Sequence, residues 1–171
     1  MAGQRDDYLL RLLAQLRELL ARLVRLRLAG GYDEALQLLM EAQERLFGRP
    51  VAEVAARPLE DQIAVLAKDV PAAVAAEKCA LYADLLREAS AVFRASGAVD
   101  LAPAALTLAA QVVLTAVGRW EGATPAPLAA AARELLHASE ATALPAGVSE
   151  GLRRLVAGTA PGAAAGGNTS A

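Results

Sequence analysis

Residues 6–36 read DDYLLRLLAQLRELLARLVRLRLAGGYDEAL, and this stretch decides the fold. Its apolar residues recur every three to four positions, which is the spacing of one side of an amphipathic helix. The spacing predicts a helix over 6–28. We expect Asp6 or Asp7 at its N-terminal cap, because a carboxylate there accepts free backbone N–H groups and opposes the helix dipole. The leucines that set the repeat are Leu9, Leu12, Leu16, Leu19, Leu20 and Leu23.

The apolar surface of this predicted helix is wide. At 100° per residue it runs from Tyr8 and Leu26 round to Leu10 and covers about 200°, whereas a helix that packs on one side needs little more than 100°. We therefore expect neighbours on two sides, either other helices of the chain or a second subunit. The opposite, polar face carries Arg11, Gln15, Glu18, Arg22 and Arg25.

Gly30 and Gly31 end the first helix, because glycine adopts the left-handed conformation of a C-terminal cap at little cost. A second helix is predicted over 33–47, and so short a connection makes two helices antiparallel neighbours. The predicted inward face of the second helix is Leu36, Leu39, Met40, Gln43 and Phe47, and its solvated face is Gln37, Glu41 and Glu44.

The rest of the chain continues this organisation. Helices are predicted over 59–68, 71–95, 103–117, 127–139 and 149–156, with one short turn near 52–56. Gly97 ends the helix that precedes it, and Pro103 suits the first turn of its own helix. We expect a single helical domain over 1–157. A flexible tail is expected over 158–171, which has neither charge nor hydrophobic periodicity.

Composition indicates an all-α fold. Hydrophobic residues make up 56% of the 171 residues, and alanine and leucine, both strong helix formers, supply most of them. Aromatic residues account for only 4%, and Ile63 is the one isoleucine. Because strands favour β-branched and aromatic residues, a sheet is not expected. The predicted fold is therefore a set of antiparallel helical hairpins packed in an array or bundle.

The hinge at Gly30–Tyr32 and the helix after it resemble part of a tetratricopeptide repeat, a helical hairpin of 34 residues that stacks in arrays. In that family a glycine turns the chain, an aromatic residue follows, and small residues recur seven apart with a large apolar residue between them. Alanine at these positions lets helices approach to about 8–10 Å. The matching residues here are Tyr32, Ala35, Leu39 and Ala42.

A second match follows Gly97, which is 67 residues after Gly30, or about two repeat periods. The hairpins near 6–47 and 74–117 therefore carry the resemblance, which implies a right-handed, tetratricopeptide-like array. The sequence departs from the family pattern over 49–70, and at Leu23 and Val99, where a small and an aromatic residue are usual. The matching residues of the second hairpin are Ala102, Leu106 and Ala109.

The N-terminal string as a whole, carried by Asp7–Arg11 and Gly31–Leu36, is similar to a group of small uncharacterised bacterial proteins with tetratricopeptide-like helices. Membership of that group implies this fold and carries no assigned activity. Function has to be argued from sites, because one fold serves many functions.

Charge and cysteine content limit the partners and the compartment. The net charge of −2 argues against nucleic acid, because phosphate binding needs a concentrated basic face. Cys79 is the only cysteine, so no intramolecular disulfide can form, which together with the absence of a visible secretory signal favours the cytoplasm. The longest uncharged stretch, Leu101–Val117, is shorter than the roughly 20 apolar residues of a membrane span. We therefore predict a buried helix there and no transmembrane segment.

The residue types that carry chemistry form no recognisable site. His137 is the only histidine, which with Cys79 is too few for a zinc site, so we interpret the first as a surface or half-buried residue and the second as a core residue. No phosphate-binding glycine loop occurs. The acid pairs stand where helices begin and are explained by the helix dipole. We predict no catalytic residue, no metal and no cofactor, and a protein that is not an enzyme. The acid pairs are Asp6/Asp7, Asp33/Glu34 and Glu60/Asp61.

The leading hypothesis is a protein–protein interaction or scaffold module that self-associates through helix 6–28 or helix 101–117. Its candidate surface is Arg11, Arg22, Arg25 and Trp120. Three interpretations of the arginines are open. They form a solvated face, they pair with acids of the second helix or of a partner, or they contact anionic lipid or nucleic acid. Trp120 is either a lid on the core or a binding anchor. Two alternatives stay open: binding to anionic membranes through the first helix, and a small-ligand binder or enzyme with a site of scattered polar residues.

Overall fold

The structure, a computed structural model, describes residues 2–158, and within this range it contains helices and no strand. Each predicted helix is present, so the all-α prediction is confirmed. Residues 159–171 of the predicted tail lie outside the described residues, and Gly158 is the last residue of the last helix. The helices are α1 (Ala2–Leu28), α2 (Tyr32–Phe47), α3 (Val51–Ala55), α4 (Leu59–Ala67), α5 (Ala72–Ser96), α6 (Ala102–Val117), α7 (Ala126–Ala138) and α8 (Ala146–Gly158).

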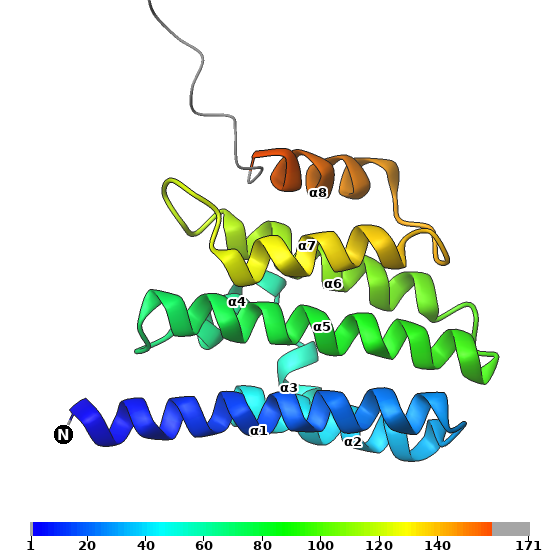
Figure 1. Cartoon of the computed structure of the whole chain (residues 1–171), viewed down its shortest axis with the longest axis horizontal. Coiled ribbons are helices and arrows are strands. Elements are labelled where there is room, and N and C mark those ends of the chain that lie inside the picture. The colour runs from blue at the N-terminus through cyan, green and yellow to red at the C-terminus, as the bar shows by residue number, and fades with distance from the viewer. Residues whose placement is uncertain (1, 159–171) are drawn as a thin grey trace, which may run out of the picture.

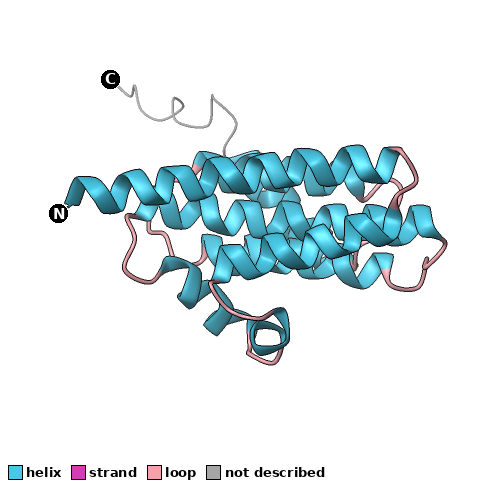
Figure 2. Cartoon of the chain, turned by 90° about the horizontal axis from the view of Figure 1, so that it is seen from below, coloured by secondary structure: helices cyan, strands magenta, loops and turns pink. Residues whose placement is uncertain are grey.

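Three antiparallel hairpins stack in chain order: α1 with α2, α5 with α6, and α7 with α8. In Figure 1, α1, α5 and α7 run in one direction, one above the other, and α2, α6 and α8 return in the opposite direction. The short helices α3 and α4 connect the first two hairpins, and α4 packs against α5 and α6. Figure 2 shows the N-terminal end of α1 projecting past its neighbours.

Helix α5 is the centre of the molecule, because it packs against α1, α2, α4, α6 and α7. Its buried residues lie all around its circumference, and Cys79, Leu85 and Val92 are each at most 1% exposed. Burying a leucine or valine fully stabilises a fold by about 1.5–3 kcal/mol. Helix α5 therefore holds the other elements together.

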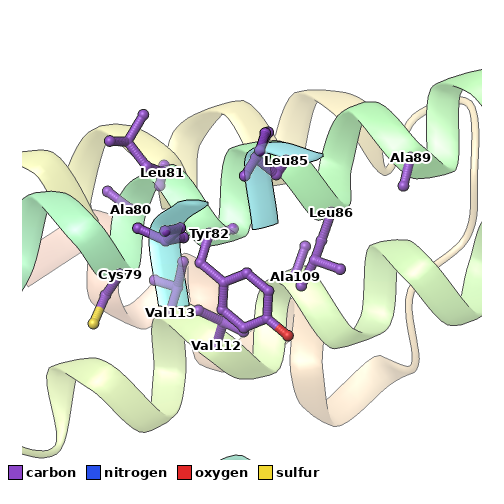
Figure 3. Packing of buried hydrophobic residues seen from close by; sticks show 14 of the residues in the cluster. Cys79, Ala80, Leu81, Tyr82, Leu85, Leu86, Ala89, Ala109, Val112 and Val113 are labelled. Carbon is purple, nitrogen blue, oxygen red and sulfur yellow. The ribbon is translucent and has the colours of Figure 1, made fainter. Parts of the chain in front are cut away.

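The seam between α5 and α6 is built largely from small side chains. Ala109 and Ala116 of α6 are fully buried, which allows close approach of the two helix axes. Figure 3 shows Ala109 and Val112 of α6 beside the ring of Tyr82 of α5. The inward face of α6 is thus covered by its own chain, whereas Leu101, which precedes the helix, is 52% exposed. No helix in the described part is long and apolar enough to cross a membrane.

The turn after α1 is closed by two backbone hydrogen bonds. The N–H of Gly30 donates to the carbonyl of Arg27 at 3.1 Å, and the N–H of Gly31 donates to that of Leu26 at 2.9 Å. Gly30 has φ 81°, as the left-handed residue of this C-terminal motif requires. The prediction that these glycines end the first helix is confirmed.

The wide apolar arc of α1 has neighbours on two sides, and both belong to this chain: α2 and α5. Leu13, Leu16 and Leu23 are at most 2% exposed. Tyr8 and Leu10, close to the projecting end, stay 65% and 61% exposed. The arc is therefore used within the fold except at its two ends, because Leu28 at the C-terminal end is also 73% exposed.

The predicted N-terminal cap of the first helix was wrong. Helix α1 begins at Ala2, so Asp6 and Asp7 lie inside it and no acidic residue stands in its first turn. Alanine, glutamine and arginine are good helix formers, and these residue types extend the helix past the two carboxylates.

The predicted inward face of α2 was wrong in part. Met40 is 53% exposed and Leu36 is only half-buried, whereas Leu39 and Phe47 are buried as predicted. The face assigned from hydrophobic spacing counted large residues, but α2 packs along a line that contains the two alanines named by the tetratricopeptide resemblance, where close approach is possible. The residues of that line are Ala35, Leu38, Ala42 and Leu46.

Candidate functional site

Helices α1, α5 and α7 together form a face with two adjoining hollows, which we call the α1–α5–α7 groove. The larger hollow, of about 410 Å³, extends to the residues that follow α7, and the smaller, of about 240 Å³, lies nearer the N-terminal end of α7. Glu134 lines both hollows. The charged and titratable residues of the groove are Arg17, Arg27, Glu77, Asp84, Arg87, Glu88, Arg94, Glu134, His137 and Glu140.

Glu88 of α5 is the most buried charged side chain of the groove, with only 5% of its surface exposed. Its Oε2 accepts a hydrogen bond from Nε of Arg27 of α1 at 3.0 Å, and its Oε1 accepts one from Nη1 of Arg87 at 3.3 Å. A buried carboxylate is costly unless opposite charges compensate it. The two guanidinium groups supply that charge and tie α1 to α5.

Arg87 also connects this buried cluster to the smaller hollow. Its Nη2 donates to Oδ1 of Asp84 at 3.4 Å, while its buried Nε has no hydrogen-bond partner in the described part of the chain. Farther towards the N-terminal end of α5, Arg17 of α1 pairs with Glu77. Two ion pairs therefore join α1 to α5, one in each hollow.

Acidic groups outnumber basic ones around the smaller hollow. Glu77, Asp84 and Glu134 line it, and Arg17 is its one lining cation among the described residues. Burial raises the pKa of the Asp84 carboxyl; Arg87 beside it acts in the opposite direction, and the charges of Glu134 and Glu88 raise it further. This end of the groove is therefore suited to stabilise positive charge.

The predicted arginine stripe lies on a different surface. Arg11, Arg22 and Arg25 are exposed, and Arg22 Nη2 lies 3.3 Å from Glu34 Oε1 of α2, which is one pairing of the kind considered from the sequence. A separate hollow between α1 and α2 is lined by Arg22, Arg25 and Arg45. The arginines that contact α5 are Arg17 and Arg27, which were not in the predicted stripe.

Trp120 lies in the loop between α6 and α7. Its side chain is half-buried and packs against the core. In Figure 1 this loop lies above α5, whereas α1 lies below α5, so the structure does not bring Trp120 together with the predicted arginines. Its burial agrees with the interpretation of this residue as a lid on the core.

His137 and Cys79 have surroundings of opposite character. The His137 side chain is 78% exposed at the rim of the larger hollow, with Nδ1 3.5 Å from Glu140 Oε2. Cys79 is fully buried, and burial raises the pKa of its thiol to about 11, so little thiolate forms near neutral pH. Within residues 2–158, no group of three or more His, Cys, Asp or Glu side chains is placed to hold a metal ion.

The groove was not predicted from the sequence. The signal available was the presence of Glu77, Asp84 and Glu88 at helical spacing on a helix that is mostly apolar. Carboxylates on one side of such a helix indicate either internal ion pairs or a solvated groove. No family model matches the chain, and comparisons with curated proteins and with solved structures found no similar protein.

Proposed function

We propose that this chain is a non-catalytic protein–protein interaction module of tetratricopeptide-like architecture, bacterial and cytoplasmic, which docks a segment of a partner in the α1–α5–α7 groove. The observation that carries the proposal is the pair of adjoining hollows along three helices that run in the same direction. Stacked hairpins provide extended surfaces of this kind, on which a helix or strand of a partner can lie.

Several groove side chains are already held in place by ion pairs, which supports this proposal. Arg27 and Arg87 are held against the buried Glu88, with about a fifth of each arginine side chain exposed. Side chains that are already fixed lose little conformational entropy when a partner binds. A docking surface of this type is therefore better prepared for binding than the exposed arginines of α1.

Site-specific photocrosslinking in living cells tests the proposal. A benzophenone amino acid at Ala91, which lines the larger hollow, should yield covalent adducts with a partner. The matched control places the same amino acid at Gln111, an exposed position of α6 that lines neither hollow. Adducts at both positions in equal yield, or at Gln111 alone, would contradict docking in the groove.

Self-association through α1 is part of the same proposal. The exposed Tyr8 and Leu10 near its projecting end supply the apolar surface. Light scattering coupled to size-exclusion chromatography at high micromolar concentration should give the mass of a dimer. The double substitution Tyr8→Ser and Leu10→Ser should return the protein to the monomer, and a wild-type monomer at that concentration would refute this part.

Binding to anionic membranes is a second candidate, favoured by Arg11 and Arg25, which are exposed and make no ion pair with the side chains that the structure describes. The apolar face of α1 is covered by α2 and α5, so the contact would be electrostatic and sensitive to salt. Sedimentation with anionic liposomes at low salt tests it. Arg11→Glu with Arg25→Glu should abolish binding and Arg153→Glu should not; absence of binding by the wild type ends this candidate.

A further inference from the structure

The smaller hollow of the α1–α5–α7 groove has an apolar floor between acidic walls. Leu81 of α5 and Ala131 of α7 form the floor and are 6% and 3% exposed. Asp84 rises from α5 on one side and Glu134 from α7 on the other. The volume of about 240 Å³ is below that of pockets for drug-sized ligands, roughly 300–1,000 Å³, so the hollow is of a size for one long side chain.

Arg17 compensates Glu77, and Arg27 and Arg87 together compensate Glu88 and Asp84, so the negative charge that the fold leaves over at this hollow is that of Glu134. Glu77 is paired with Arg17, and the charge of Arg87 is divided between Asp84 and Glu88. Glu134, an exposed residue at the edge of the hollow, makes no ion pair with any described side chain, and its charge opposes ionisation of Asp84. A positive group placed between Asp84 and Glu134 would remove this repulsion.

We propose that the smaller hollow receives a lysine or arginine side chain of the docked partner, with its alkyl stem on Leu81 and Ala131 and its charged end between Asp84 and Glu134. The inference rests on the docking function proposed above. Long basic side chains combine these two features, an apolar stem and a charged tip, and charge-assisted hydrogen bonds to carboxylates are strong.

Other side chains fit this hollow poorly. A carboxylate or phosphate would face Glu134 without a free cation, because the lining Arg17 is already paired with Glu77. An uncharged apolar side chain would remove water from Asp84 and Glu134 and return no hydrogen bond, which is unfavourable. The chemistry of the walls and of the floor therefore favours the same type of side chain.

The test uses the full-length protein and small mimics of the two side chains. In ¹H–¹⁵N NMR titrations at constant ionic strength, n-butylammonium and n-butylguanidinium should produce saturable shifts confined to amides around the hollow, and they should lower the pKa of the Asp84 carboxyl. n-Butanol, the uncharged control, should produce much smaller shifts. Asp84→Asn with Glu134→Gln should weaken the apparent affinity for both cations about tenfold. The matched variant Glu41→Gln, which alters an exposed acid of α2, should leave it unchanged.

Two outcomes would overturn the inference. One is a response to n-butanol equal to that of the cations, and the other is cation-induced shifts spread evenly over exposed acids such as Glu53 and Glu60. The result also separates this inference from the docking proposal. Crosslinks at Ala91 without cation binding would leave docking in place and remove the preference for basic side chains. Cation binding without crosslinks would leave a cation site and remove docking.

Discussion

The first and second hairpins consist of similar residues but are held by different interactions. The seam between α5 and α6 is apolar and tight, with Ala109 and Ala116 fully buried. The first hairpin joins α5 through leucines and also through two arginines of α1 that pair with Glu77 and Glu88. A hairpin at the end of a stack has a neighbour on one side only, so it can relax where the centre cannot. The ion pairs at the end of the stack therefore hold the first hairpin against α5 and also supply charged residues of the groove.

Truncating one leucine in each region gives the largest expected effect. Leu85 of α5 and Leu16 of α1 are both 1% exposed, so the transferred apolar surface is similar. Leu85→Ala should lower the free energy of unfolding by about 4–5 kcal/mol and Leu16→Ala by about 2–3 kcal/mol, because the end hairpin can collapse into its cavity. Urea unfolding measures both values. Equal losses would show that the end of the stack is as rigid as its centre.

Removing the buried carboxylate should have the next largest effect. Glu88→Ala leaves Arg27 and Arg87 without their compensating charge and should cost about 2–3 kcal/mol, less than for a fully buried pair because the arginines are partly exposed. Hydrogen exchange should show the loss of protection mainly in α1 and α2, and less in α6. Glu41→Ala, at an exposed acid of α2, is the control and should change little. A loss spread evenly over all helices would mean that the pair does not hold the end hairpin specifically.

The free energy of unfolding should depend on pH in a way that reflects the raised pKa of Asp84. The folded chain raises the pKa of Asp84, so it holds this proton more tightly than the unfolded chain does. The free energy of unfolding contributed by this group therefore falls as the pH rises from the unfolded pKa, near 4, through the folded pKa. Asp84→Asn should gain stability relative to wild type across that window and show no relative gain at lower pH. Urea unfolding of both proteins at a series of pH values checks this. A variant whose stability relative to wild type falls as the pH rises through this window would contradict it.

Breaking the exposed pair of the first hairpin should have the smallest effect. Arg22 and Glu34 are 56% and 59% exposed, and ion pairs in this setting contribute about 0–1 kcal/mol. Arg22→Ala should therefore change the free energy of unfolding by less than about 0.5 kcal/mol, and added salt should remove the difference. A larger loss of unfolding free energy that does not depend on salt would contradict this, and would mean that Arg22 contributes to stability as Arg27 does.

The helices were predictable from the sequence because local signals agree along the chain. The spacing of the leucines predicted α1, and the glycines at 30 and 97 adopt the left-handed conformation at the helix ends where they were expected. The start of α1 was missed because Gln4 and Arg5 favour helix and the single glycine at position 3 does not stop it. The inward face of α2 was partly missed where it was assigned from large residues alone, whereas the alanines at 35 and 42, named by the tetratricopeptide resemblance, are buried.

The groove was not predictable, because its parts are distant in the sequence. Arg27 and Glu88 are 61 residues apart, and no local pattern shows which arginine of α1 will reach which acid of α5. The arginines that do share a clear local pattern, Arg11, Arg22 and Arg25, face solvent. Regular spacing identifies a solvated face, whereas the choice of partners across helices is decided by how the hairpins stack.

Because Cys79 lies in the central hairpin, its oxidation can report how often this part of the fold opens. Its sulfur is shielded from oxidants and from other molecules as long as α5 stays packed. In a preparation stored in air without reductant, where dissolved oxygen takes up the two electrons of the thiol pair, disulfide-linked pairs of chains should form only from molecules in which that packing has opened. Because this reaction is slow compared with reclosing, a non-reducing gel followed over days would report how large a fraction of the chains has α5 open, with no label or engineered residue.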